Sequence, residues 1–439
     1  MAEFSTPTTE QEFQLNFAQL KPHMNRTEAL YESSRCLFCF DAPCIKACPS
    51  GIDIPQFIRQ INSGNDTGAA RTIYEANYFG NACGKVCPTE VLCEGACVYN
   101  LQDVKPIEIG RLQSFATMQA IEQNKKIMRP GEANGRKVAV IGAGPAGISA
   151  ACELRTLGYE VDVYEAKARP SGLTVYGVAP YKITNEETLA EMDYLQGQLG
   201  YRVHYNSPIT SRAELQALEH KYDAIFLGIG LGRTSELGLP GEDRINVMGA
   251  VEFIAELRQH HHEVAVGRKV IVLGGGNTAM DAASESARLG AEDVILAYRR
   301  GKEEMGAYEF EYDLAKGVGV KGLFNVAPVE IVGNGHVQGV KFVRTETADG
   351  KVREVPGSEF IEPCDMVIKA TGQAKQTEFL GLIEGLKLDA KGRIVAGENG
   401  QTTNPKYFTS GDAMNGGAEV VNAAAEAKAT ARAIHAYLQ

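Results

Sequence analysis

KVAVIGAGPAG, residues 137–147, is the stretch that decides the fold, and KVIVLGGGNTA at residues 269–279 is its counterpart. Each begins with a short apolar run typical of a buried strand and continues into a glycine-rich turn. A helix is predicted after each turn, and second strands follow at residues 160–164 and 293–298. The sequence therefore predicts two βαβ units of the kind that bind dinucleotides.

The first turn fits a dinucleotide pyrophosphate. Glycine is required where the chain bends, where the backbone nears the phosphates, and where the helix packs on the strand, with the helix N-terminus facing the charge. These positions fall within Gly142, Gly144, Pro145, Ala146 and Gly147. Glu165 ends the second strand, where an acidic side chain binds ribose hydroxyls. This context favours a nucleotide site over an unrelated glycine loop.

The second turn differs from the first at the end of its second strand. Its candidate residues for binding NAD(P) are Gly274, Gly276, Asn277, Thr278, Ala279, Ala370, Thr371 and Gly372. Arg299 and Arg300 stand where a carboxylate would repel a 2′-phosphate, and guanidinium groups can bind that phosphate. The pattern favours NADPH over NADH, although a solvated strand end is the alternative.

One turn with Glu165 and one with arginines indicate FAD in the first unit and a nicotinamide cofactor in the second. A late strand, YFTSGD at residues 407–412, supports this, because its aspartate can bind the ribityl chain and the next helix begins near the flavin. The further flavin candidates are Gly172, Leu173, Lys182, Gly411, Asp412, Ala418, Glu419 and Val420. The arrangement resembles flavoprotein disulfide reductases, but Cys152 and Cys364 are not spaced as a CxxC pair and are expected in the core.

Eight of the ten cysteines lie between Cys36 and Cys97. The first four, with spacing CxxCx4Cx3CP, resemble the bacterial ferredoxin run, in which the last cysteine serves the other cluster. Four more follow in two CxxxC pairs, so two groups of four can hold two 4Fe-4S clusters by exchanging ligands. Structural zinc is a less favoured alternative, because zinc sites usually pair two CxxC motifs. Disulfides are less favoured still in a cytoplasmic chain.

Length and composition place limits on the protein. With 439 residues the chain is expected to form about two to four domains. Its net charge of −11 argues against nucleic acid and anionic membranes as partners. Neither a secretory leader nor a membrane span is predicted, so we expect a cytoplasmic protein. The expected domains are a helical region with two clusters at 1–135, an FAD domain at 136–235 and 375–439, and an inserted NAD(P) domain at 236–374.

Three stretches carry a specific family resemblance. Residues 35–58 (RCLFCFDAPCIKACPSGIDIPQFI), residues 68–97 (GAARTIYEANYFGNACGKVCPTEVLCEGAC) and residues 106–116 (PIEIGRLQSFA) resemble the N-terminal region of dihydropyrimidine dehydrogenase. The resemblance is greatest to its separate NAD(P)-linked bacterial subunit. It implies a hetero-oligomer in which this chain passes electrons from NAD(P)H through FAD and its clusters to a subunit with FMN and iron-sulfur clusters, which reduces uracil or thymine.

The family pattern also implies the cluster ligands. It assigns one cluster to Cys36, Cys39, Cys44 and Cys97, and the other to Cys48, Cys87, Cys93 and the amide oxygen of Gln113, so Cys83 is no ligand. Without the resemblance, Gln113 would be interpreted as a polar helix residue. The chain departs from the family pattern at Ser171, Lys182 and Gly306, which concern the flavin and NADPH contacts.

Two rival functions share features of this sequence. The nearest is the small subunit of glutamate synthase or a ferredoxin-NAD(P) transhydrogenase-type subunit, which has the same architecture. A non-catalytic electron-transfer scaffold is less favoured because both glycine turns are intact. His260, His261 and His262 are interpreted as a solvated helix end rather than a metal site.

Overall fold

A computed structural model describes residues 4–439, which form two compact units. The larger unit contains residues 19–175, 182–231 and 375–439, and the smaller unit contains residues 4–18, 176–181 and 232–374. The smaller unit is thus mostly one insertion between two parts of the larger.

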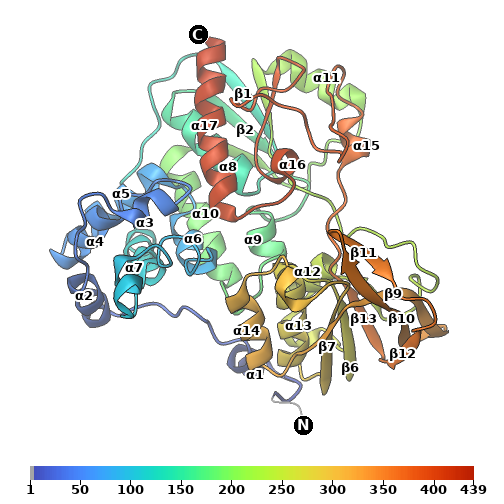
Figure 1. The fold of residues 1–439 in the computed structure, drawn as a ribbon. Helices are drawn as coiled ribbons and strands as arrows, with labels where there is room; N and C mark the ends of the chain where they lie inside the picture. Colours follow the sequence, from blue (N-terminus) through green and yellow to red (C-terminus); the bar gives the residue numbers. More distant parts are fainter. Residues whose placement is uncertain (1–3) are drawn as a thin grey trace. The chain divides into compact units, whose positions relative to one another are not determined.

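The larger unit is built on a parallel sheet in the order β14-β4-β1-β2-β3 (Figure 1). Its strands are β1 (Lys137–Ile141), β2 (Glu160–Tyr164), β3 (Arg202–His204), β4 (Ala224–Leu227) and β14 (Tyr407–Thr409). In β1, Val138 pairs with Val161 on one side and Ala224 on the other, and all three side chains are buried. The continuous apolar run of β1 reflects this central position between parallel neighbours.

Helices of the same unit pack around this sheet. They are α8 (Pro145–Thr156), α10 (Asn185–Leu199), α11 (Arg212–Lys221), α15 (Thr377–Leu380), α16 (Asp412–Asn415) and α17 (Val420–Leu438), with α9 (Leu173–Tyr176) at the boundary with the smaller unit. The long C-terminal helix α17 runs beside α8 (Figure 1). Ala427 and Ala431 of α17 are fully buried, so their small side chains permit close packing.

The N-terminal part of the larger unit is helical, as the sequence predicted. It contains α2 (Arg26–Ser34), α3 (Pro43–Ala47), α4 (Ile54–Asn62), α5 (Asp66–Ala76), α6 (Gly80–Val86), the 3₁₀ turn η1 (Val98–Gln102) and α7 (Ile109–Glu122). A core that includes Phe57, Ile58 and Leu112 joins α4 to α7. The eight clustered cysteines all lie in this helical part, mostly in the connections between helices.

The smaller unit contains the second parallel sheet, in the order β5-β13-β6-β7-β8. Its strands are β5 (Val247–Gly249), β6 (Lys269–Leu273), β7 (Asp293–Tyr298), β8 (Lys321–Phe324) and β13 (Met366–Lys369), and its longer helices are α12 (Ala250–His260), α13 (Asn277–Arg288) and α14 (Glu309–Gly317). Both predicted βαβ units are therefore confirmed.

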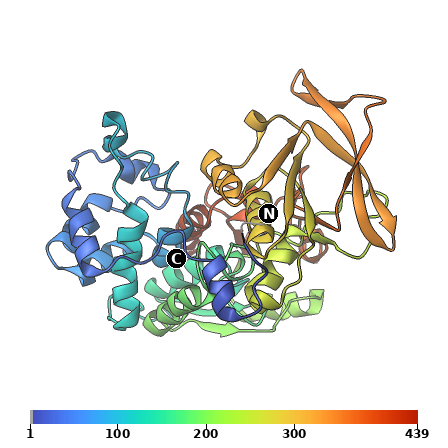
Figure 2. The same cartoon turned by 90° about the horizontal axis from the view of Figure 1, so that it is seen from below.

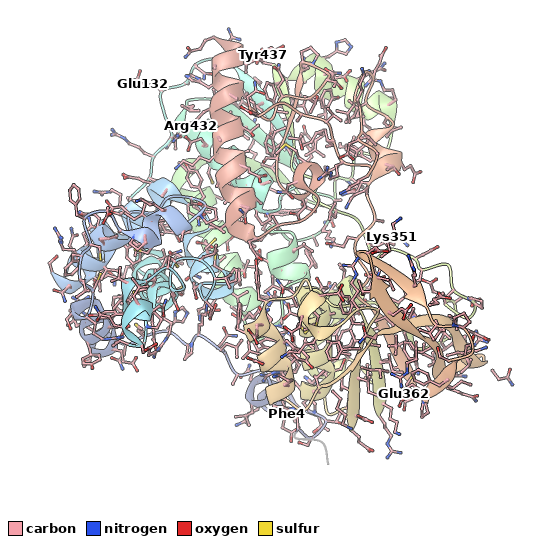
Figure 3. The ribbon with its side chains drawn as sticks, in the orientation of Figure 1. Phe4, Glu132, Lys351, Glu362, Arg432 and Tyr437 are labelled. Atoms are coloured by element: carbon pink, nitrogen blue, oxygen red, sulfur yellow. The ribbon has the colours of Figure 1, made fainter. Side chains whose placement is uncertain are left out.

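The smaller unit also contains an antiparallel sheet, whose twisted strands are drawn in orange in Figure 2. It contains β9 (Val326–Asn334), β10 (His336–Ala348), β11 (Lys351–Glu354) and β12 (Phe360–Pro363). Its longest strand is β10. Lys351 and Glu362, labelled in Figure 3, lie on β11 and β12.

Residues 4–18 belong to the smaller unit, whereas the sequence analysis placed them in the helical region with the clusters. Helix α1 (Glu10–Asn16) contacts η2 (His261–Glu263), and the Phe13 ring stacks on His261 with centroids 4.7 Å apart. Glu10 Oε2 also lies 3.0 Å from His261 Nδ1. The histidines do follow a helix end, but His261 packs against α1 instead of being solvated.

No helix within residues 4–439 is both long and apolar enough to cross a membrane.

A further short 3₁₀ turn, η3 (Lys302–Glu304), completes the regular structure of the smaller unit.

Candidate functional site: two nucleotide turns and two cysteine-lined cavities

The first glycine turn connects β1 to α8 with an open face for a ligand. Gly142 has φ +98°, and a Cβ there would lie 2.5 Å from the Gly228 carbonyl oxygen. A Cβ on Gly147 would lie 1.9 Å from the Gly142 oxygen, whereas one on Gly144 would meet no atom closer than 3.9 Å. Two glycines thus close the turn, and the third leaves backbone open beside the N-terminus of α8.

Glu165 lies at this turn, as predicted. Its Oε2 accepts a hydrogen bond from Ala143 N at 2.7 Å, and its Oε1 accepts one from Lys167 N at 2.8 Å. The loop with Gly172 also packs on the turn, because Ser171 N donates to Ala143 O at 2.7 Å. Ser171 has φ +78° and is fully buried, so the family's usual glycine is replaced here by serine in a left-handed conformation. Leu173 follows on α9 and Lys182 is half-buried.

The turn at residues 410–412, which follows β14, packs against the first glycine turn. A Cβ on Gly411 would be 3.2 Å from the Ala146 side chain, which places residues 411–412 beside the start of α8. Asp412 Oδ1 accepts from Ala418 N at 3.0 Å, and burial together with the nearby Glu426 charge raises the pKa of Asp412. Ser410 Oγ is buried and has no hydrogen-bond partner among residues 4–439. An open glycine, a helix N-terminus and an unpartnered hydroxyl fit a dinucleotide such as FAD.

One cavity of the helical part is lined by the four cysteines assigned to the first cluster. Cys36, Cys39, Cys44 and Cys97 surround it, together with apolar side chains that include Ile58 and Ile107. Residues 36 and 97 are far apart in sequence, and the Tyr99 hydroxyl, which donates to Arg35 O at 2.7 Å, ties the two segments together.

A second cavity is lined by the candidates for the other cluster. Cys48, Cys87, Cys93 and Gln113 all face it, and so does Cys83. Gln113 Nε2 donates to Gly80 O at 2.6 Å, which leaves the amide oxygen available to the cavity. The structure therefore brings all eight predicted ligands together in two sets, and it adds Cys83 to the second set.

The thiols lie in apolar surroundings that favour their neutral form. Burial raises the pKa of the Cys44 thiol to about 12, and it raises the pKa of Cys36 and of Cys48 as well. Binding of iron must therefore displace protons from these thiols. Within residues 4–439 no three His, Cys, Asp or Glu side chains form a site for a single metal ion. The first cavity has four potential ligands, the number that a 4Fe-4S cluster uses, and the second has five, counting Cys83.

The second cavity also touches the flavin side of the larger unit. Val421, at the start of α17, lines it and is buried. Glu419 and Val420, which precede it, are flavin candidates, and the α17 N-terminus follows the 411–412 turn. Residues expected to contact FAD and residues expected to bind iron are therefore neighbours on one helix end.

The second glycine turn, in the smaller unit, has the same construction as the first. Gly274 has φ +154°, and a Cβ there would lie 2.4 Å from Ala370 O, whereas a Cβ on Gly276 would meet nothing within 4 Å. Helix α13 starts directly after Gly276, so its first residues, Asn277 and Thr278, present backbone N–H groups to a ligand, and Ala279 is buried. Asn277 Oδ1 accepts from Tyr308 N at 3.1 Å, which fixes the adjoining loop.

The remaining candidates for the NAD(P) site adjoin this turn. Arg299 is exposed and Arg300 half-buried at the end of β7, and Arg300 Nε is buried without a hydrogen-bond partner among residues 4–439. An unpartnered guanidinium N–H fits an anionic group of the nucleotide. Ala370 N donates to Leu273 O at 2.7 Å, and Thr371 and Gly372 follow it as exposed residues.

Sequence reasoning missed two carboxylates on α10, Glu191, which is buried, and Glu187, which is half-buried. Glu191 is fully buried and accepts hydrogen bonds from Asn81 N at 2.6 Å and Ala82 N at 3.0 Å. Burial raises the pKa of Glu191 to about 7, although these hydrogen bonds oppose the rise. Glu187 lies 2.9 Å from Lys85 Nζ. No sequence signal distinguishes these residues from exposed glutamates of an amphipathic helix.

Comparison with protein families gives two matches. Residues 14–125 match dihydropyrimidine dehydrogenase domain II, 4Fe-4S cluster, and residues 136–427 match pyridine nucleotide-disulphide oxidoreductase. The chain belongs to the pyridine nucleotide-disulphide oxidoreductase family. It is an NAD(P)H-dependent flavin oxidoreductase with an N-terminal 4Fe-4S region, as the sequence predicted.

Relatives of this oxidoreductase include two kinds of protein. The NADPH glutamate synthase small chain of Escherichia coli strain K12 is 34% identical, with 97% of this chain and 94% of that protein aligned. The NAD-dependent dihydropyrimidine dehydrogenase subunit PreT of the same strain is also 34% identical, with 96% and 97% aligned. Both relatives match almost end to end.

Solved structures share the fold of the oxidoreductase. Mycobacterium tuberculosis FprA in complex with NADPH has a TM-score of 0.58 at 20% identity over 69% of this chain and 84% of that one. The thioredoxin reductase of T. acidophilum has a TM-score of 0.55 at 21% identity over 69% of this chain and 98% of that one. At these identities the likeness establishes the fold alone.

Proposed function

We propose that this chain is the electron-input subunit of a cytoplasmic dihydropyrimidine dehydrogenase. It oxidises NAD(P)H and delivers electrons to a partner subunit that carries FMN and iron-sulfur clusters and reduces uracil or thymine. The observation that carries the proposal is that the eight candidate ligands line two cavities. One of these cavities reaches the flavin-side helix α17 through Val421.

The domain roles follow from the residues each part contains. Residues 1–135 hold two clusters, residues 136–235 and 375–439 bind FAD, and residues 236–374 bind NAD(P). FAD, when bound, accepts electrons in pairs and releases them singly, which is the chemistry needed between a nicotinamide and a cluster. The open backbone at Gly144 and at Gly276 admits the two pyrophosphates, and Glu165 and Asp412 orient the flavin nucleotide.

The ligand sets follow the two cavities. Cys36, Cys39, Cys44 and Cys97 hold one cluster. Cys48, Cys87 and Cys93 hold the other with the Gln113 amide oxygen, whose orientation is supported by the hydrogen bond from Gln113 Nε2 to Gly80 O. An amide in place of a thiolate leaves that cluster less negative and changes its reduction potential.

NADPH is the favoured donor. Arg299 and Arg300 can bind a 2′-phosphate, and the buried Nε of Arg300 has no other partner among the described residues. Gly306 supplies no further charge to this site.

The acceptor is tested by reconstitution. We expect uracil-dependent oxidation of NADPH, faster than of NADH, only when the holo-chain is mixed with its FMN-containing partner. The isolated chain should reduce artificial acceptors but not uracil, because uracil reduction is assigned to the FMN-containing partner. Uracil reduction by the isolated chain would contradict the division of labour.

Glutamate synthase is the second candidate, favoured by the similarity to that enzyme's small chain over 97% of this sequence. The same mixing experiment separates the two. If NADPH oxidation depends on glutamine and 2-oxoglutarate with a glutamate synthase large chain, and not on uracil with the FMN partner, the second candidate is correct.

A further inference from the structure

Glu191 is a carboxylate buried between three helices of the larger unit. It projects from α10, and its Oε1 accepts from the Tyr74 hydroxyl of α5 at 3.0 Å and from Asn81 N at 2.6 Å. Its Oε2 accepts from Ala82 N at 3.0 Å. A buried carboxylate costs free energy unless its acceptors are satisfied, and here both oxygens are engaged by donors.

The two backbone N–H groups belong to the first turn of α6. Gly80 begins that helix, and its carbonyl accepts the hydrogen bond from Gln113 Nε2. Asn81 Oδ1 accepts from Ser114 Oγ at 3.0 Å, so the same turn also holds the neighbouring residue of α7. The turn that Glu191 fixes is therefore the turn that fixes the amide of Gln113.

Helix α6 packs closely against α5 and α7, so its backbone has little room to shift. A Cβ on Gly84 would lie 2.7 Å from Gly110 O, and one on Gly80 would lie 2.7 Å from the Ile73 side chain. A shift of the first turn of α6 would therefore move the Gly80 carbonyl relative to Gln113, because neighbouring elements prevent compensation.

We propose that Glu191 is a positioning residue for the cluster bound by Cys48, Cys87, Cys93 and Gln113. Its carboxylate anchors the first turn of α6 from α10, and that turn orients the Gln113 amide through the Gly80 carbonyl. The inference rests on the proposed function, since it requires Gln113 to be a ligand. Glu191 is not among the described residues that line this cavity.

Glu191→Gln tests the role in the holo-chain. The amide keeps one acceptor oxygen but turns an N–H donor toward Ala82 N–H or Asn81 N–H, which breaks one anchoring hydrogen bond. We expect the reduction potential of the Gln113 cluster, followed by electron paramagnetic resonance, to shift by about 59 mV. For one electron this is about a tenfold change in the equilibrium constant for reduction. The cluster of Cys36, Cys39, Cys44 and Cys97 should keep its potential.

Glu153→Gln is the matched control. Glu153 on α8 is also buried, and its Oε2 also accepts from a tyrosine, Tyr78, at 2.8 Å. Its other oxygen accepts from Arg432 on α17, labelled in Figure 3, and it bonds no backbone N–H of α6. Its substitution should leave both cluster potentials unchanged.

A Gln113→Leu background distinguishes positioning from a simple charge effect. If Glu191 acts through Gln113, the shift caused by Glu191→Gln should disappear in that background. The same shift in both backgrounds, no shift in either, or an equal shift of both clusters would overturn the proposal. If Gln113→Leu alone changes nothing, the ligand assignment in the proposed function fails instead.

Tyr74→Phe provides a second variant if Glu191→Gln does not retain its clusters. It removes the hydrogen bond that orients Oε1, the oxygen that also accepts from Asn81 N, so the carboxylate should hold the first turn of α6 less firmly. A smaller shift confined to the Gln113 cluster supports the proposal, and an unchanged potential overturns it.

Discussion

Cys83 and Gln113 both face the second cavity, yet a 4Fe-4S cluster with Cys48, Cys87 and Cys93 needs only one of them. Cysteine is the usual ligand, so residue type alone favours Cys83. One contact favours Gln113: the hydrogen bond from Gln113 Nε2 to Gly80 O holds its amide in place.

Substituting each residue in turn decides between them. Gln113→Leu should change the electron paramagnetic resonance spectrum and the reduction potential of the cluster in the second cavity, because it removes the oxygen ligand. Cys83→Ala should retain both clusters with unchanged spectra and iron content. The reverse outcome, with iron lost only from Cys83→Ala, would make Cys83 the ligand.

Glu187 gives the larger unit a pH-dependent contribution to stability. Burial alone would raise its pKa, but the hydrogen bond from His23 and the charge of Lys85 outweigh it and lower the pKa to about 2. A carboxyl whose folded-state pKa lies below its unfolded value of 4.5 stabilises the fold above that pH. The contribution is lost as pH falls toward 2.

We therefore expect Glu187→Gln to lower stability at neutral pH, by on the order of 3 kcal/mol. The difference from wild type should shrink below about pH 5 as the wild-type carboxyl becomes protonated. Thermal melting across this pH range measures the effect, with the exposed Glu384→Gln as control. A difference that stays constant with pH would contradict the assignment.

Sequence reasoning at this scale succeeded where a residue belongs to a motif. Spacing indicated the eight clustered cysteines, the family resemblance implied the ligand sets, and the structure places all of these residues around two cavities. Glu191 and Glu187 were not found, because their partners Asn81 and Lys85 lie more than 100 positions away in the chain. Such contacts depend on how α10 packs, which local sequence does not specify.

At the scale of elements, the glycines within each turn have two different functions. One kind is needed by the backbone fold, and the other leaves space for a ligand. Gly274 is needed by the fold, since its φ is +154° and a side chain would collide with Ala370 O. Gly276 faces open space, so glycine there serves the approach of a ligand.

A pair of alanine substitutions tests this distinction. Gly276→Ala should keep the melting temperature and raise the KM for NADPH by about tenfold or more, because its methyl group meets the pyrophosphate. Gly274→Ala should lower stability by roughly 1–3 kcal/mol through backbone strain and collision. If Gly276→Ala melts early with an unchanged KM, the turn does not hold the nucleotide.

The elements themselves were predictable to within a few residues. Apolar runs bounded by glycine gave the strands at residues 137–141 and 293–298, because buried parallel strands tolerate few polar residues. The position of α1 was not predictable. Its docking depends on Phe13 meeting His261, and neither residue carries a local signal for that contact.

At the scale of the whole molecule, the chain joins its cysteine-rich helices and its first nucleotide turn into one compact unit. The start of α17 belongs to both sites, since Val421 lines the second cavity and Glu419 and Val420 are flavin candidates. Electrons leaving the flavin should therefore enter the Gln113 cluster first and continue to the cluster of Cys36, Cys39, Cys44 and Cys97.

The most direct measurement compares wild type with Cys44→Ser, which removes a ligand of that last cluster. Under anaerobic conditions, excess NADPH should bleach the flavin at the same rate in both proteins, because Cys44 lies outside the nucleotide sites. Reduction of a one-electron protein acceptor such as cytochrome c should fall at least about tenfold in the variant. Flavin that does not bleach, or undiminished cytochrome c reduction in Cys44→Ser, would contradict electron flow from nicotinamide through flavin to the clusters.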